Sequence, residues 1–396
     1  MGVRETSLLI DCIRSQLNKS RTRDDGIAKS TTVDWFRLVE TARAHGVTPI
    51  LYRGTSNHKG PKPPPETAEK LKAHALGTRL RNIAMAREAV RIAELLKRDG
   101  IAALVFKGPV LAQTVYGDVG MREFSDLDFL VHESEVEGVN EALRADGYRP
   151  RAMSLASAPT IIRRSCEDWF EKPGSPNAID LHWRMTPRFF PFSPGVEAVR
   201  DRAIAIEFER GCVRTLSPSD TITFICVHAA KHGWVTLREV TDLAFALRKF
   251  GSEIDWDELF GAAKSLGAAS MIALGLILAR GLLGVDVRPF LRIAPRSSLE
   301  ELASRIEKRI LSGKVGRSFF DEWGVPLVAI DGNGRRFRYA AQRVISPTID
   351  DWEFVPLPER LFPLYYMLRP ARLTLSAPRS FRTPKQPWKR LRRTRE

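Results

Sequence analysis

The chain has 396 residues, 43% of them hydrophobic, and a formal net charge of +15. The length allows two or three domains, each with its own core, and the hydrophobic share is ordinary for a globular protein. The charge favours anionic partners, namely nucleotides, nucleic acid, acidic lipid surfaces or polyanionic substrates.

Cysteine spacing and the distribution of apolar residues argue against a disulfide-rich, secreted or membrane-spanning protein. No two cysteines form a CxxC pair, which argues against a disulfide framework or a structural zinc site and for free thiols in a reducing cytosol; they are Cys12, Cys166, Cys212 and Cys226. The N-terminus lacks the long apolar region of a signal peptide. The longest apolar stretch, 268–285, is interrupted by Arg280, and it predicts a buried helix rather than a membrane span of about 20 residues. We therefore expect a cytoplasmic protein with no stable membrane span.

Residues 1–97 are predicted to form an N-terminal helical region. Apolar residues recur at spacings of three and four in 7–17, 32–44 and 66–96, as on one face of a helix. Asp34 precedes the second apolar run and is a candidate capping residue. A loop rich in Gly, Pro and Lys, 54–65, separates the second helix from the third.

Residues 98–215 read as a small α/β core. The apolar run 101–106 predicts a buried strand, followed by a short helix at 110–116 and a second strand at 124–131. A helix is expected at 134–146, with Ser134 as its N-cap and Gly147 near its end. A third strand is expected at 148–154, helix or turns and then a loop over 155–176, and a further strand at 177–184.

Beyond residue 215 the pattern becomes helical again. Helices are predicted at 217–232, 236–250, 256–266, 268–283 and 297–311, and residues 216–315 are interpreted as a helical domain that closes a nucleotide cleft. Residues 316–377 are interpreted as a C-terminal docking segment. Residues 378–396 form a basic tail that is expected to be disordered. The tail either contacts an anionic surface or nucleic acid or is a solvated end.

Two carboxylates one residue apart are the strongest chemical signal. Asp126 and Asp128 lie within a run of β-prone apolar residues. Because strand side chains alternate between faces, both should project from one face while Leu127 and Phe129 pack on the other. Two adjacent carboxylates repel each other unless a positive group lies between them. A divalent metal such as Mg²⁺ is the usual solution, which indicates chemistry on a phosphate-bearing substrate.

A third carboxylate, Asp180, lies in the alternating strand predicted at 177–184. If that strand neighbours the one carrying Asp126 and Asp128, the three acids form a triad. Metals bound by carboxylates can then clamp a triphosphate while the third acid helps to activate an attacking hydroxyl.

Several polar residues near the acids are candidate nucleotide ligands. Lys107 and Gly108 stand between a strand and a helix, where a lysine and backbone N–H groups can contact phosphate. Arg122 and Ser125 flank the acids and can contact phosphate oxygens. For Lys107 the alternative is a surface lysine, and for Arg122 it is a pair with Glu123 or Asp118.

The predicted helix at 217–232 carries a second set of candidates. Lys231 is a candidate triphosphate contact with His232 beside it, and Asp242 on the next helix is expected to anchor the helix pair. His228 and His232 are four residues apart and therefore share a helix face, so a zinc pair is the alternative.

These blocks in this order resemble the uncharacterised nucleotidyltransferase family, a branch of the DNA polymerase β-like nucleotidyltransferase superfamily. The resemblance covers roughly residues 30–290, and its blocks are Lys107-Gly108, Tyr116, Arg122, Ser125 to Asp128, Leu130-Val131, Ile179 to Trp183, His228 to Trp234, Leu237 and Asp242-Leu243. It implies an α+β fold in which a small mixed β-sheet core with helices is flanked by N-terminal and C-terminal helical regions.

The resemblance further implies transfer of a nucleoside monophosphate from an NTP with Mg²⁺, for which Mn²⁺ is a substitute. It implies Asp126 and Asp128 as metal ligands and Asp180 as the third acid. One departure is Gly108-Pro109, where the superfamily usually has Gly-Ser or Gly-Gly. Phosphate binding would then depend on Lys107, the backbone and Ser125.

The sequence thus favours an Mg²⁺-dependent nucleotidyltransferase with a small-molecule, glycan-precursor or peptide acceptor. One rival keeps the fold and takes tRNA or other RNA, as toxin-like members of the superfamily do; the positive charge permits it, although no RNA-binding module is recognised. The other rival is a non-catalytic nucleotide-binding protein. The presence of three carboxylates argues against that rival, because a binding protein has no need of the third.

Overall fold

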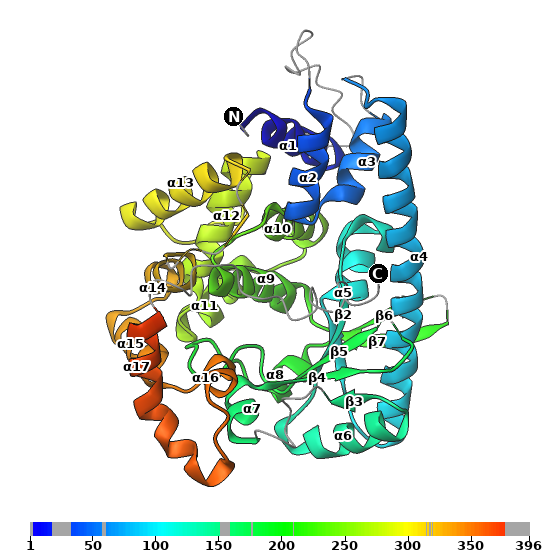
Figure 1. Ribbon diagram of the computed structural model, residues 1–396. Coiled ribbons are helices and arrows are strands. Elements are labelled where there is room, and N and C mark those ends of the chain that lie inside the picture. The colour runs from blue at the N-terminus through cyan, green and yellow to red at the C-terminus, as the bar shows by residue number, and fades with distance from the viewer. Residues whose placement is uncertain are drawn as a thin grey trace.

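The computed structural model describes residues 3–17, 33–57, 61–150, 159–175, 177–208, 210–313, 315–316, 318 and 320–376. Figure 1 shows a sheet with the long helix α4 along one side of it and a helical assembly on the other. The predicted basic tail, 378–396, lies outside the described residues. The predicted α+β class is confirmed: a five-stranded mixed sheet is surrounded by helices.

The N-terminal region is helical, as predicted, and it contains one helix more than expected. Its helices are α1 (Val3–Leu17), α2 (Trp35–His45), α3 (Thr48–Asn57) and α4 (Pro65–Arg98). Asp34 caps α2 by accepting a hydrogen bond from the Arg37 N–H. The loop predicted to begin at residue 54 is wrong there, because α3 continues to Asn57. Gly54 lies against α1, where a Cβ would approach the Cys12 Cβ to 2.7 Å, so this glycine allows two helices to approach closely.

The five-stranded sheet has the order β1-β2-β5-β4-β3, and its strands are β1 (Leu104–Phe106), β2 (Asp126–Leu130), β3 (Arg149–Pro150), β4 (Glu167–Glu171) and β5 (Ala178–His182). β2 and β5 are parallel, whereas the other neighbours are antiparallel. This pairing confirms that the strand bearing Asp180 neighbours the strand bearing Asp126 and Asp128. A separate hairpin consists of β6 (Ile204–Phe208) and β7 (Gly211–Thr215).

One face of the sheet forms the core of the α/β unit. Leu127 and Phe129 of β2 and Ile179 and Leu181 of β5 are buried in a cluster with Val139 of α6 (Val136–Ala145) and with residues of α4. These residues alternate along both strands, so the side chains between them point to the opposite face. The opposite face is therefore available for polar groups.

Several elements of the α/β unit differ from the prediction, and β1 begins at Leu104 and not at residue 101. The segment expected to be helix or turns contains the strand β4. Its charged residues do not give the sequence pattern of a strand, although Asp168 and Phe170 are buried. The helix expected from residue 134 begins with a 3-10 turn, η3 (Glu133–Glu135), that His132 caps in place of Ser134. The strand predicted at 148–154 is described as far as Pro150. The shorter elements are α5 (Gly108–Leu111), the π-type turn η1 (Ala112–Tyr116), the 3-10 turn η2 (Val119–Met121), α7 (Pro159–Ser165) and α8 (Val196–Asp201).

The five helices predicted after residue 215 are confirmed as α9 (Pro218–His232), α10 (Leu237–Phe250), α11 (Trp256–Ser265), α12 (Ala269–Leu283) and α13 (Ser297–Leu311). One hydrophobic cluster joins them to the N-terminal helices, with Leu38 and Ile50 packed in the same core as Leu243 and Leu274. Within the described ranges, no helix has the length and apolar character needed to cross a membrane.

Residues 320–376 form a further helical segment, comprising η4 (Phe320–Gly324), α14 (Val325–Ala329), α15 (Asn333–Ile345), α16 (Ile349–Phe354), η5 (Glu359–Leu364) and α17 (Tyr365–Ser376). Tyr339 of α15 packs edge-on against Phe190, and Arg369 of α17 forms a buried ion pair with Asp351 of α16. The segment is thus built from its own internal contacts and from contacts with the α/β unit.

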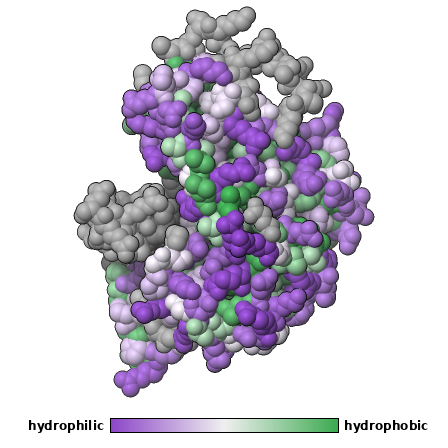
Figure 2. Space-filling view, turned by 90° about the vertical axis from the view of Figure 1, so that its right-hand side faces the viewer, coloured by the Kyte–Doolittle hydropathy of each residue, from purple (hydrophilic) through white to green (hydrophobic). Residues whose placement is uncertain are grey.

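Figure 2 views the molecule from the side on which α4 lies and shows a mostly hydrophilic surface with apolar residues near its middle. α4 itself buries one side against the sheet, and it also carries Leu76 and Leu80 with 55% and 60% of their surface exposed.

Candidate active site

The acids lie on the sheet face that is opposite to the apolar core. In the parallel pairing of β2 and β5, Asp128 stands directly opposite Asp180, and Leu130 stands opposite His182. Alternation along each strand places Asp126, Asp128, Asp180 and His182 on this one face. Asp128, Asp180 and His182 are 2%, 5% and 7% exposed, so charged groups are gathered where water solvates them poorly.

Lys107 reaches this face from the turn between β1 and α5. Its Nζ lies 2.6 Å from the Asp128 Oδ1. The Lys107 backbone has φ 59, in the left-handed region, and Gly108 follows with φ 35. A Cβ on Gly108 would lie 3.2 Å from the Asp126 carbonyl oxygen. The glycine therefore lets this turn approach the backbone of β2 and brings the lysine to the acids.

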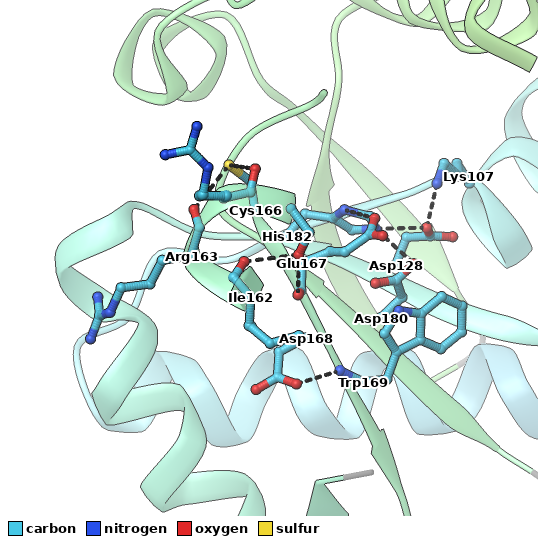
Figure 3. A network of polar contacts seen from close by, with 12 residues as sticks. Lys107, Asp128, Ile162, Arg163, Cys166, Glu167, Asp168, Trp169, Asp180 and His182 are labelled. Atoms are coloured by element: carbon cyan, nitrogen blue, oxygen red, sulfur yellow. Dashed lines mark hydrogen bonds and ion pairs between the residues drawn. The ribbon is translucent and has the colours of Figure 1, made fainter. Parts of the chain in front are cut away.

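His182 bridges the two facing acids (Figure 3). Its Nε2 lies 3.2 Å from the Asp128 Oδ1 and 3.0 Å from the Asp180 Oδ2, and its Nδ1 lies 3.8 Å from a Glu167 oxygen. Burial alone would lower the pKa of His182, but Asp180 and Asp128 outweigh it and raise the pKa to about 9. The ring is therefore an imidazolium at neutral pH that neutralises part of the acid cluster.

The carboxylates differ in their response to this environment. Burial favours the neutral form of Asp128, but Lys107 and His182 outweigh it and lower its pKa. The pKa of Asp126 is raised by burial and by Asp128. The pKa of Asp180 is raised by burial, which the favourable contact with His182 does not offset. Glu167 behaves like Asp180, with burial and then Asp180 raising its pKa. The acidic groups of the cluster thus outnumber the positive charges that Lys107 and His182 supply.

The donor set fits a metal ion. Within the described ranges, Asp128, Asp180 and His182 form a group whose possible ligand atoms all lie within 4.8 Å of one another. An imidazolium does not bind a metal, so the two carboxylates are the candidate ligands of this group. The Asp180 Oδ1 is buried, and no hydrogen-bond partner for it lies among the described residues. A buried carboxylate oxygen without a partner is costly, and a divalent cation bound by carboxylate oxygens would satisfy it. Asp126 carries a further carboxylate on the same face, two residues before Asp128.

Two predicted nucleotide ligands, Ser125 and Arg122, flank the acids in different environments. Ser125 is exposed at the start of β2. Arg122 is 9% exposed, and it binds Asp242 of α10 with two contacts of 2.9 and 3.0 Å. Asp242 also accepts a hydrogen bond of 2.6 Å from the Tyr116 hydroxyl. Arg122 therefore joins the core to α10, while its charge acts on Asp126.

α9 supplies the wall that faces the acids. The ring of Phe224 packs edge-on against Phe106, which in turn packs against His182, and the Lys107 Nζ lies 5.1 and 5.3 Å from the centroids of Phe106 and Phe224. Lys231 and His232 lie at the end of α9 and are half-buried, and the Lys231 charge acts on Glu167. Of the two predicted α9 residues, Lys231 is therefore close enough to the cluster for its charge to act there.

The sequence contained a signal for one of the two cluster residues that it did not assign. His182 follows Asp180 by two residues in a strand, so the alternation that paired Asp126 with Asp128 also places His182 beside Asp180. Glu167 carried no such signal, because its position depends on β4 lying beside β5. The His228 and His232 rings are 4.5 Å apart, and they are not part of the metal-binding group found within the described ranges.

Three comparisons relate the chain to known proteins. The model of a family described as uncharacterised nucleotidyltransferase matches residues 31–284. No curated protein matches the chain. Among solved structures, the solution structure of the antibiotic-resistance factor ANT(2'')-Ia is similar at 13% identity with a TM-score of 0.34, over 47% of this chain and 93% of that chain. At this TM-score the similarity carries no argument about the reaction or its substrates.

Proposed function

Because this chain belongs to the uncharacterised nucleotidyltransferase family, we propose that it transfers a nucleoside monophosphate from an NTP to a hydroxyl or phosphate of a small-molecule, glycan-precursor or peptide acceptor. The chain is an enzyme of the nucleotidyltransferase class, and an NTP is its substrate. The nature of the acceptor and the use of Mg²⁺ are parts of the proposal.

The observation that carries the proposal is the direct pairing of Asp128 with Asp180 across two parallel strands. This register places two buried carboxylates side by side, with Asp126 on the same face. Such a cluster is electrostatically unfavourable without a cation. A carboxylate set of this kind suits Mg²⁺, which prefers oxygen ligands and often completes its shell with substrate phosphates.

We assign the residues the following roles. Asp126, Asp128 and Asp180 hold the metal, which when bound would neutralise phosphate charge and polarise the α-phosphorus for attack. Lys107, now paired with Asp128, is placed to exchange that contact for a phosphate oxygen. Gly108, Arg122, Ser125, Lys231 and His232 complete the nucleotide environment, with Arg122 acting through its charge while it remains paired with Asp242.

Asp180 is proposed to accept the proton of an acceptor hydroxyl. The acceptor oxygen forms a bond to the α-phosphorus, the bond from that phosphorus to the bridging oxygen breaks, and pyrophosphate leaves with the bonding electrons. A carboxylate held within hydrogen-bond reach of the acceptor hydroxyl can serve as this general base. His182 positions Asp180 relative to Asp128 through the contacts to both acids.

The test is transfer of label from each α-labelled NTP, in the presence of Mg²⁺, to components of an extract of the source cell. Asp128→Asn preserves the side-chain shape and removes its charge. We expect it to reduce transfer about 100-fold or more, since a metal contributes several kcal/mol to such a reaction. Glu137→Gln makes the same chemical change on exposed α6 and should retain wild-type transfer.

The product distinguishes the acceptor classes. Label on a small product supports the proposal, whereas label on RNA would replace the acceptor that we propose. Wild-type transfer by Asp128→Asn would contradict the proposed role of the carboxylate pair. Nucleotide binding without transfer of label from any NTP would leave the non-catalytic rival.

A further inference from the structure

A cavity lies apart from the carboxylate cluster. Its volume is about 600 Å³, within the range of small-molecule sites, and it is lined by residues from α1, α3, α4, η1, η2, α10 and the β6–β7 hairpin. We propose that this cavity binds a phosphate-bearing small molecule through its arginines. Five arginines line it, against the two carboxylates of Asp118 and Glu207; they are Arg53, Arg79, Arg87, Arg210 and Arg248.

The α4 side of the cavity is basic because of helical spacing. Arg79, Ile83 and Arg87 follow one another at intervals of four residues, so they lie on one face of α4. All three line the cavity, which places two guanidinium groups along the same wall. Guanidinium groups bind phosphate oxygens with two parallel hydrogen bonds and are less strongly hydrated than ammonium groups.

One carboxylate is shared between two of the arginines. The Nη1 atoms of Arg79 and Arg53 lie 3.1 and 3.5 Å from the same Asp118 Oδ2. Asp118 is also fixed by the Gly120 N–H, which donates to its Oδ1. Two guanidinium groups that share the single Asp118 carboxylate leave a net positive charge beside the η2 turn. A phosphate group would supply the missing negative charge.

Another part of the lining is a preformed aromatic stack. The Tyr116 and Phe245 rings are stacked at 4.5 Å, and the Arg248 guanidinium lies 4.7 Å from the Phe245 centroid. Arg248 also donates to the carbonyl oxygens of Gln16 and Leu17. These contacts fix the wall before any ligand arrives, which lowers the entropic cost of binding.

The cavity is separate from the catalytic cluster. Asp128, Asp180, His182 and Lys107 do not line it. Tyr116 connects the two places, because its ring lines the cavity while its hydroxyl bonds to Asp242, the partner of Arg122. The inference does not depend on the transfer reaction, and the cavity can bind its ligand whether or not transfer occurs.

The experiment measures binding of inorganic pyrophosphate to the full chain by isothermal titration calorimetry in EDTA. Without a divalent metal the carboxylate cluster repels a polyanion, so the arginine cavity should account for binding. The double variant Arg79→Gln/Arg87→Gln should bind pyrophosphate about tenfold or more weakly, because it loses charge-assisted contacts. Thermal melting of each variant establishes that it is folded.

Two controls make the outcome specific. Arg98→Gln removes an arginine from α4 that donates to the Glu94 carbonyl of its own helix, and it should bind like wild type. Arg288→Gln removes an exposed arginine that pairs with Asp286 at the surface, and it should also bind like wild type. Equal affinity in the Arg79/Arg87 double variant, a comparable loss of affinity in either control, or absence of binding by the wild-type protein would each overturn the inference. The transfer assay decides the proposed function separately.

Discussion

Lys107 has a backbone conformation that is rare for a lysine. Its φ of 59 lies in the left-handed region, where a residue other than glycine pays roughly 1–3 kcal/mol. Such strain persists where the surroundings determine the conformation, and it concentrates at active sites. Here the surroundings are the Asp128 ion pair and the Phe106 and Phe224 rings. The strain is therefore consistent with a lysine positioned for its charge.

The His182 imidazolium forms a buried ion pair with Asp180, whose Oδ2 lies 3.0 Å from the His182 Nε2. Removing one partner of a buried ion pair costs about 3–5 kcal/mol, since the other charge is left buried. We expect His182→Gln to destabilise the protein by this order in EDTA, and to cost less when Asp180→Asn is already present. Urea unfolding of both single variants and the double variant measures the coupling, which should reach about 1 kcal/mol or more.

The double-mutant cycle formed by these variants separates the effect of the His182 charge from the effect of its packing. His182 also packs edge-on against Phe106 at 5.3 Å, and that contact is lost equally in both backgrounds. Strictly additive effects of the two substitutions would therefore show that the imidazolium does not stabilise the acids.

At the scale of elements, His45 ties the end of α2 to the start of α10. Its side chain is fully buried, and its Nδ1 accepts a hydrogen bond from the Leu237 N–H at 3.1 Å. Protonation would place a second hydrogen against this donor. Burial, and then the nearby Arg309, lower the pKa of His45 to about 4.

This burial predicts a pH-dependent stability. The pKa of His45 in the folded protein lies below its unfolded value of about 6.5. The stability that neutral, buried His45 contributes is therefore fully present above pH 6.5 and is lost as the pH falls towards 4. Between pH 7 and pH 5 we expect a loss of about 2 kcal/mol. His45→Gln keeps an acceptor for the Leu237 N–H and cannot titrate. Urea unfolding at both pH values should show the smaller loss in the variant; parallel losses would contradict the assignment.

The helices were predictable because each carries an apolar face that repeats with helical spacing, as in α9 to α13. The strand β4 was not predictable from the sequence, because Glu167 and Glu171 place charges in it. Its stability comes from pairing with the neighbouring strands β5 and β3. α3 was missed because Gly54 reads locally as a loop residue, although it serves close packing against Cys12.

At the candidate active site, too, some features follow from local sequence patterns and others depend on long-range contacts. Strand alternation was enough to place Asp126 and Asp128 on one face, and the register confirms that Asp180 joins them. The pair between Arg122 and Asp242 was not predicted, because the two residues are 120 positions apart and no local pattern relates them. Local periodicity thus predicts which side chains share a face, whereas long-range pairing decides which faces meet.

On the scale of the whole molecule, the pair between Arg122 and Asp242 joins the α/β unit to the helical region. Both side chains are at most 10% exposed, and Tyr116 adds a hydrogen bond to the same carboxylate. We expect Asp242→Asn to lower the free energy of unfolding by about 3 kcal/mol, because Arg122 is left buried without its counterion.

Urea unfolding measures this effect, with Asp286→Asn as the matched control. Asp286 pairs with Arg288 at the surface, where the two side chains are 56% and 87% exposed, so its substitution should leave the free energy of unfolding nearly unchanged. Equal effects of the two substitutions would show that the Arg122 pair does not hold the two parts together.

The register of β2 against β5 has a consequence for how this enzyme can fail. The pairing that sets Asp128 opposite Asp180 also sets Leu127 opposite Ile179 and Phe129 opposite Leu181. A slip of one residue in either strand would turn its acids into the apolar core and its core residues towards the polar face. A mispaired chain would therefore lose its fold together with its chemistry. Errors in strand pairing should leave unfolded protein for degradation and not a stable, inactive competitor for substrate.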